Sequence, residues 1–218
     1  MASTKIIIVR GPELSAQPWW NAVHRLIIAS FETKEEQVFP PSWKRLNQDP
    51  QIAAYKLGND ELGPRGHFAI VFENDKPVAC GGVLPFRGEN WINHVESDEL
   101  RKAKVSNSEL QTEEEFSVSP EEKIANWEIC CFCVSPAHRR KGLSHILIEA
   151  LLDFVKPRGA KRLVSNYSIK ETGNFWSKMG FVTIPGAGGV LKKGFTHTGG
   201  MEGLRADIHF RMGERAVA

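Results

Sequence analysis

The sequence predicts a mixed α/β fold, and three observations carry this prediction. An apolar run over 127–134 is followed by a loop, an amphipathic pattern over 143–155 and a second run over 162–168. That order is typical of a βαβ unit with a right-handed crossover. Two further apolar runs, over 67–73 and 76–84, are separated by only two residues, as in an antiparallel hairpin. A chain of 218 residues is also long enough for one well-packed core.

The N-terminal part should contribute one strand and two helices. Lys5 to Arg10 is β-branched and apolar, which favours a strand. The next helix should bury one apolar stripe at helical spacing, made of Trp19, Val23, Leu26, Ile27 and Phe31. A short helix is expected over 42–46, with Trp43 and Leu46 facing inward.

The hairpin has two features that fix its geometry. Asn74-Asp75 is a turn dipeptide whose residues tolerate positive φ. Gly81-Gly82 lies inside the second arm. Paired glycines in a strand predict a bulge or a close approach of another backbone.

The C-terminal half should hold the central strand and the last elements of the sheet. The run over 127–134 is almost unbroken in its apolar character, as expected of a strand covered on both faces, and Glu128 is its exception. A short helix is expected over 172–179. The last two strands are expected over 181–184 and 206–212.

Residues 87–125 form an acidic insertion within a single domain that spans 1–218. The segment holds ten acidic and five basic residues and therefore carries a charge of −5, whereas the remainder of the chain carries +7. It lacks sustained periodicity. Two interpretations stay open: a solvated loop, or a lid over a substrate site, since long loops in compact domains are often functional.

Composition excludes several classes of protein. A net charge of +2 is too small for a nucleic-acid surface. Three of the four cysteines, Cys130, Cys131 and Cys133, crowd into one strand, so they form neither a disulfide framework nor the paired spacing of a zinc site. Reduced thiols and no bound metal are therefore expected.

Nothing in the sequence predicts a membrane protein. No stretch approaches the roughly 20 apolar residues that span a bilayer. The apolar run Ile6 to Val9 is too short for the core of a signal peptide. We expect a cytoplasmic protein without nucleic-acid or membrane partners.

The loop after the central strand predicts an anion site. A strand that ends at Val134 and turns into a helix presents unpaired backbone N–H groups at the helix N-terminus. Arg139, Arg140 and Lys141 add positive charge, and Gly142 lets the backbone approach a phosphate closely.

The stretch 134–144, V-x-P-x-x-R-R-x-G-L-S, resembles the acetyl-CoA-binding signature Q/R-x-x-G-x-G/A of the GNAT superfamily of N-acetyltransferases. The stretch 175–181, FWSKMGF, is similar to a second element of that superfamily. The resemblance covers about 127–184. It implies a GNAT-like fold, with a mixed, mostly antiparallel sheet and a central βαβ unit flanked by helices.

The resemblance also implies acetyl-CoA as a cosubstrate, with no metal. Its pantetheine arm would bond the end of the central strand as an additional strand does, and its pyrophosphate would sit on the loop before the helix. Ser144 stands where the family has Gly or Ala, and Trp176 stands where it has a tyrosine that protonates the thiolate. The residues assigned to the cofactor in this way are Phe132, Cys133, Val134, Arg139, Arg140, Lys141, Gly142, Leu143, Ser144 and Trp176.

Two residues are candidates for acid–base chemistry. Glu128 lies eleven residues before Arg139, where the histone-acetyltransferase branch has its catalytic glutamate, and it could remove the proton of the acceptor amine. Alternatively, it lies at the exposed beginning of the strand or pairs with an arginine. Tyr167 is the candidate to replace the missing tyrosine, although a core or substrate-lining role is an equal alternative. Water or the ammonium formed during attack could also protonate the thiolate.

The predicted function is transfer of an acetyl group from acetyl-CoA to the primary amine of a small cationic molecule, by direct attack in a ternary complex. The acidic insertion motivates the cationic acceptor. One alternative is acetylation of a protein lysine or N-terminus, with 87–125 as the peptide-docking surface. Another is a non-catalytic acyl-CoA-binding module, motivated by Trp176. The sequence leaves the acyl chain length and the oligomeric state open, a homodimer included.

Overall fold

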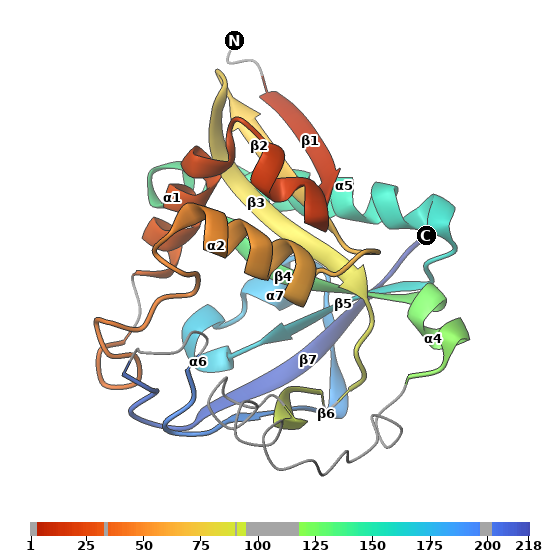
Figure 1. Cartoon of the computed structure of the whole chain (residues 1–218). Helices are drawn as coiled ribbons and strands as arrows, with labels where there is room; N and C mark the ends of the chain where they lie inside the picture. Colours follow the sequence, from red (N-terminus) through yellow and green to blue (C-terminus); the bar gives the residue numbers. More distant parts are fainter. Residues whose placement is uncertain (1–3, 33–34, 90, 95–117, 197–201) are drawn as a thin grey trace, which may run out of the picture.

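The computed structural model describes residues 4–32, 35–89, 91–94, 118–196 and 202–218. They form a seven-stranded sheet with the order β1-β2-β3-β4-β5-β7-β6 (Figure 1). The strands are β1 (Thr4–Arg10), β2 (His67–Glu73), β3 (Lys76–Pro85), β4 (Asn126–Val134), β5 (Arg162–Tyr167), β6 (Val182–Leu191) and β7 (Ile208–Ala216). Only β4 and β5 pair in parallel; the other neighbours are antiparallel. The predicted fold class is confirmed.

Helices cover both faces of this sheet. α1 (Trp20–Phe31) and α2 (Pro50–Tyr55) lie on one face, and α5 (Leu143–Val155) lies on the other (Figure 1). The shorter helices are α4 (Pro120–Ala125), α6 (Ile169–Thr172) and α7 (Phe175–Lys178). Single 3-10 turns occur at Gly11–Ala16, Trp91–His94, Pro136–His138 and Lys156–Arg158, and a π-helical turn occurs at Lys56–Glu61.

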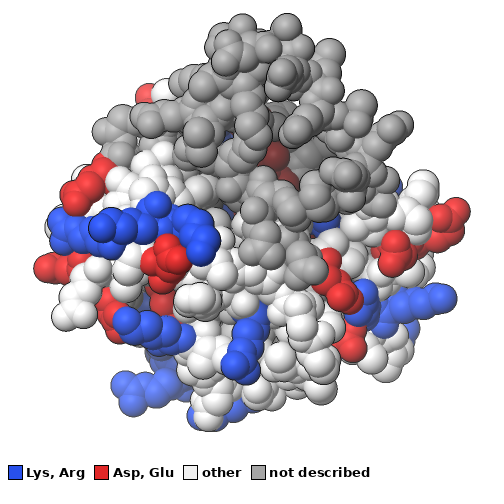
Figure 2. All heavy atoms as spheres, turned by 90° about the horizontal axis from the view of Figure 1, so that it is seen from below, with Lys and Arg blue, Asp and Glu red and all other residues white. Residues whose placement is uncertain are grey.

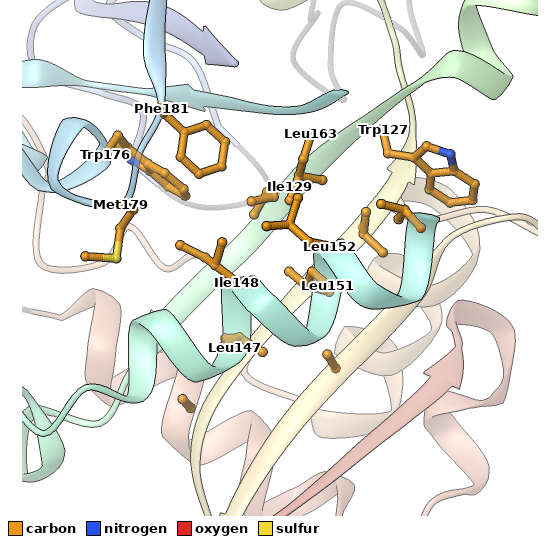
Figure 3. Close-up of a cluster of buried hydrophobic side chains, with 14 of the residues drawn as sticks. Trp127, Ile129, Leu147, Ile148, Leu151, Leu152, Leu163, Trp176, Met179 and Phe181 are labelled. Atoms are coloured by element: carbon orange, nitrogen blue, oxygen red, sulfur yellow. The ribbon is translucent and has the colours of Figure 1, made fainter. Parts of the chain in front are cut away.

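The core on the α5 face follows from the apolar stripe of that helix. Leu147, Ile148 and Leu151 have no exposed surface and pack on the sheet beside Ile129 and Leu163 (Figure 3). Burying each such side chain stabilises the fold by about 1.5–3 kcal/mol. This packing holds α5, and with it the loop before α5, in a fixed position under β4.

The opposite face has its own core. Trp20, Val23 and Ile27 of α1 are fully buried and pack on Phe68 and Ile70 of β2. The predicted stripe of this helix therefore faces the sheet as expected. Because successive residues of β2 point to alternate faces, this strand contributes to both cores.

The predicted hairpin is present. β2 and β3 pair in antiparallel register, from Glu73 opposite Lys76 to His67 opposite Val83. Asn74 and Asp75 between them have φ values of 49° and 61°, the conformation that two-residue hairpin loops require.

Four predicted elements differ from the structure. Residues 42–46 are not helical, because tertiary packing overrides so short a helical pattern. Trp43 and Leu46 are nevertheless buried as expected. The helix predicted over 172–179 is shorter in the structure, as α7, and a separate helix, α6, precedes it. Gly173 between them adopts φ 54° and ψ −127°, outside the helical region. The last strands are longer than predicted.

Helix α2 was not predicted, although its sequence carries a start signal. Asp49 accepts hydrogen bonds from the backbone N–H groups of Gln51 and Ile52, and Pro50 occupies the first helical position. Both features are typical of helix N-termini.

Most of the acidic insertion lies outside the described residues, which resume at 118. At its C-terminal end, α4 begins with a capping box between Ser119 and Glu122, which satisfies two backbone donors. No helix within the described part of the chain is both long and apolar enough to cross a membrane.

Candidate active site

The sheet opens between β4 and β5. Their parallel pairing runs from Asn126 opposite Arg162 only as far as Ile129 opposite Ser165, although β4 continues to Val134. Beyond Ile129 the edge of β4 that faces β5 has no strand partner in the described structure. An extended ligand could therefore bond this edge as an additional strand.

A β-bulge on the other edge of β4 accompanies the opening. Cys80 of β3 lies opposite Cys133, and Gly82 lies opposite Cys130, so two residues of β4 face Gly81 alone. Such an extra residue bends the strand, and Cys131 within the bulge has a φ of +47°. The bulge or close approach predicted from the glycine pair is confirmed.

Gly81 is required for this close approach. A Cβ atom at this position would lie 2.9 Å from a ring carbon of Phe132, closer than real Cβ contacts. Only glycine lets β3 and the bulged strand pack at this distance. Because Phe132 also lines the cavity described next, the bulge positions one of its walls.

A cavity of about 240 Å³ lies at the opening. It brings together four residues that the sequence analysis selected from three separate elements. These residues are Glu128, Phe132, Tyr167 and Trp176.

Glu128 lies in the wall of this cavity and has no exposed surface. Arg87 donates to both carboxylate oxygens, from Nη2 to Oε1 at 2.6 Å and from Nε to Oε2 at 3.1 Å. The indole Nε1 of Trp91 donates to Oε1 at 2.9 Å. The expectation that Glu128 lies at an exposed beginning of the strand is therefore wrong. The alternative expectation, that Glu128 pairs with an arginine, is confirmed.

The same contacts fix the position of Arg87. Burial alone would lower the pKa of Arg87, but the carboxylate of Glu128 more than offsets this effect, and the pKa is raised. Its guanidinium carbon also lies 3.4 Å from the ring centroid of Trp91, in cation–π contact. The sequence analysis did not select Arg87, although a carboxylate in an apolar strand indicates that a buried cation must lie nearby.

A second ion pair lies in the same wall. Arg45 Nη2 donates to both carboxylate oxygens of Glu61, at 2.6 and 2.8 Å. Burial lowers the pKa of Arg45, and the nearby Glu61 carboxylate outweighs this effect and raises it. Burial raises the pKa of the neighbouring Cys130 thiol well above its usual range, so this thiol stays neutral.

Tyr167 and Trp176 form the wall on the α5 face. Their rings are 5.9 Å apart, and Trp176 also packs against Phe132 and Phe181 at 5.5 and 5.1 Å. The Tyr167 hydroxyl lies 3.1 Å from Thr183 Oγ1. Both predicted residues therefore line the cavity, within a largely aromatic surface.

Polar atoms without a partner mark the cavity wall. Ser165 Oγ, both amide atoms of Asn166 and Nε1 of Trp176 are buried and have no hydrogen-bond partner among the described residues. These three residues line the cavity. A buried polar atom without a partner costs about 1–3 kcal/mol, so these atoms point to a ligand. The sequence analysis missed Ser165 and Asn166, which no spacing pattern singles out.

The basic loop lies at the N-terminus of α5. Arg139, Arg140, Lys141 and Gly142 are exposed, and the side chain of Leu143 is buried. Gly142 has a φ of +79°, and, apart from its two chain neighbours, no described residue has an atom within 4 Å of the position where its Cβ would be. Open space above the first turn of a 13-residue helix is suited to an anion.

The remaining predicted positions have other surroundings. Ser144 is half-buried in the first turn of α5. The Cys133 side chain packs on the α1 face, with its Sγ 3.5 Å from that of Cys80, whereas Val134 packs toward α5. Among the described residues, no group of three or more His, Cys, Asp or Glu side chains is placed to hold a metal ion.

The outer surface carries mixed charge. Figure 2 shows that lysine and arginine side chains are interspersed with aspartate and glutamate over the described part of one face. In this view the described charges of the two signs are mixed rather than gathered into one basic stripe.

Comparison with known proteins identifies the family. The model of the acetyltransferase (GNAT) family matches residues 20–181. An N-acetyltransferase from Staphylococcus aureus Mu50 is 14% identical, with a TM-score of 0.55 and coverage of 99% of each chain. An acetyltransferase of the GNAT family from Streptococcus pneumoniae is 12% identical, with a TM-score of 0.55 and coverage of 98% of this chain and 99% of the other.

An aminoglycoside 6'-N-acetyltransferase complexed with coenzyme A is similar to the same extent. It is 12% identical, with a TM-score of 0.54 and coverage of 97% of each chain. No curated protein matches the sequence. At these identities the solved structures show a shared fold, and the family model covers most of the chain. The chain belongs to the GNAT family of acetyltransferases.

Proposed function

We propose that this protein transfers an acetyl group from acetyl-CoA to the primary amine of a small molecule that is a cation in solution, in one ternary complex. The observation that carries this proposal is the opening between β4 and β5. It joins an unpaired strand edge to a cavity whose wall contains the buried carboxylate of Glu128. This arrangement supports the meeting of an extended thioester with an amine that must lose a proton.

Acetyl-CoA fits the cofactor side of the opening. The pyrophosphate would bind the backbone N–H groups at Gly142 and the first turn of α5, beside the exposed Arg139, Arg140 and Lys141. The pantetheine arm would follow the edge of β4 from Phe132 to Val134. The unpartnered Nε1 of Trp176 and Oγ of Ser165 would provide hydrogen bonds near the thioester.

In the transfer step, Glu128 would accept a proton from the acceptor. The ammonium first loses one proton, and the neutral amine nitrogen then attacks the thioester carbonyl carbon, so that a C–N bond forms and the C–S bond breaks. The nitrogen loses a second proton as the amide forms, and the CoA thiolate takes up one proton. Arg87 and Trp91 occupy three of the roughly four lone-pair positions of the carboxylate. We propose that the remaining lone pair of Oε2 accepts the proton of the acceptor, either directly or through one water.

Tyr167 is the proposed donor of the proton that the leaving CoA thiolate takes up. Its hydroxyl lies in the cavity wall beside Trp176 and is oriented by Thr183 Oγ1. Tryptophan has an N–H donor but cannot release that proton at neutral pH. Tyr167→Phe should therefore lower kcat about 100-fold without changing the Kd for acetyl-CoA, and an unchanged kcat would remove this assignment.

The proposed base is tested by Glu128→Gln, followed by CoA release under saturating acetyl-CoA and amine. Glutamine keeps the volume of the side chain but cannot take up a proton, so kcat should fall about 100-fold. The KM for acetyl-CoA should not change. Glu149→Gln is the matched control, because Glu149 is exposed on α5 and pairs with Arg215. Full activity of the Glu128 variant would contradict the role of a base.

A non-catalytic role is the second candidate, because Trp176 occupies the place of the family's proton donor. Calorimetry with acetyl-CoA, combined with a broad panel of amines and lysine peptides, separates the two. Tight binding without CoA release from any acceptor would favour the binding module over the enzyme. Product formation only with peptides would favour acetylation of proteins.

A further inference from the structure

The acceptor side of the cavity is walled by aromatic rings that come from separate segments. Phe39 and Trp43 follow α1, Trp91 follows β3, and Phe195 and Phe210 come from the C-terminal part of the chain. Phe39 and Trp43 stack edge to face at 4.9 Å. This wall therefore offers flat apolar surfaces to a ligand in the cavity.

Five charged side chains line the cavity, and four of them neutralise one another, the fifth being Glu171. Arg45 is paired with Glu61, and Arg87 is paired with Glu128. Removing one member of a buried pair from its partner is costly. An acceptor with a carboxylate, a phosphate or a second ammonium therefore gains no free counter-charge from these four residues.

Asn166 provides a neutral polar contact on the same side. Val164 lies opposite Glu128 in the parallel pair, and Asn166 lies two residues further along β5. Because alternate residues of a strand share a face, Asn166 projects from the face that carries Glu128. Both polar atoms of its amide are buried without a partner among the described residues. Its Oδ1 can accept a hydrogen bond from an amine N–H.

The size of the cavity limits the acceptor further. Pockets for drug-sized ligands measure about 300–1,000 Å³, and this cavity measures about 240 Å³. It suits an amine with one ring and a short chain better than an amino sugar of several rings.

We infer that the acceptor is a primary amine on a short chain attached to an aromatic ring, with Asn166 as the residue that positions the amine. The ring would lie against Phe39 and Trp43, and the nitrogen would lie between Asn166 and Glu128. This inference rests on the proposed function, because it names the acceptor of the same transfer.

The test compares 2-phenylethylamine with putrescine, glucosamine and lysine, with acetyl-CoA as donor and acetylated products measured by mass spectrometry. The value of kcat/KM for 2-phenylethylamine should exceed each of the others at least tenfold. Faster turnover of putrescine, glucosamine or lysine would overturn the acceptor class and leave the transferase intact. Turnover of no amine would overturn the proposed function itself.

Variants then locate the binding surface. Trp43→Leu and Asn166→Ala should each raise the KM for 2-phenylethylamine about tenfold, with an unchanged KM for acetyl-CoA. Tyr55→Leu is the matched control, because Tyr55 is 60% exposed on α2 and outside the cavity wall. Unchanged kinetics of both variants would overturn the proposed surface.

A measurement on the unaltered protein covers the case in which a variant does not fold. Calorimetry in the presence of CoA should detect binding of 2-phenylethylamine at least tenfold tighter than binding of putrescine. Equal or weaker binding of 2-phenylethylamine would overturn the inference.

Discussion

The two sides of the cavity are built in different ways. The cofactor side consists mainly of backbone groups from one continuous stretch, 132–144, which runs from the bulged strand through the loop into α5. The acceptor side consists of side chains from segments far apart in the sequence, among them Arg45, Arg87, Asn166 and Phe210. The first side depends on local conformation. The second depends on the whole fold bringing its parts together.

This difference predicts which kind of substitution should impair each side of the cavity. A backbone site tolerates most changes of side chain and fails when the conformation fails. A site made of paired side chains fails when one partner is removed. The predictions below use matched variants on the two sides, beginning with the largest expected effect.

Arg87→Ala should cost about 3 kcal/mol of the free energy of unfolding, because it leaves the buried Glu128 without its cation. Arg139→Ala on the cofactor side should cost almost nothing, since Arg139 is exposed. Urea denaturation of both variants measures the difference. Equal stability of the two would show that the ion pair of Glu128 contributes no more than a surface charge.

Gly142→Ala should raise the KM for acetyl-CoA about fivefold, because a residue with a side chain is strained by roughly 1 kcal/mol at positive φ. Gly186→Ala is the matched control. Gly186 has a φ of +77° with open space around it but lies in β6, away from the loop. The control should lose similar stability and keep its KM. A rise in KM for both variants would show that the effect is not local to the loop.

Ionic strength should produce the smallest effect. Exposed charges are screened as the Debye length falls below about 10 Å, so the KM for acetyl-CoA should rise about threefold between roughly 0.05 and 0.5 M NaCl. The KM for the amine should change less, because Arg45 and Arg87 are paired within the cavity wall. Steady-state kinetics over a salt series tests this, and a larger change in the amine KM would reverse the comparison.

The same contrast explains what could be predicted from the sequence. The hairpin turn at 74–75, the glycine pair at 81–82 and the loop before α5 were predicted because local conformation requires particular residues there. Glu128 was selected because a charge stands out in an apolar strand. Its partner was not, since 41 positions separate it from Arg87 and no local pattern links them.

The aromatic wall of the cavity could not be predicted from the sequence for the same reason. Trp43 was expected to be buried, and it is, but the helix expected around it is absent because tertiary packing overrides a short helical pattern. Asn166 lies in the strand next to the central one, and no sequence pattern around it indicates a site residue. Its amide has no hydrogen-bond partner among the described residues, at the place where β4 and β5 separate.

The short ladder between β4 and β5 has a mechanical consequence. It joins two leaves of the sheet, β1 to β4 on one side and β5, β7 and β6 on the other, through pairs that end at Ile129 and Ser165. Although α5 packs on strands of both leaves, this seam is the place where we expect them to separate first in local unfolding. A pantetheine chain bonded along the free edge of β4 would lie in this seam, and we expect bound acetyl-CoA to couple the unfolding of the two leaves more strongly.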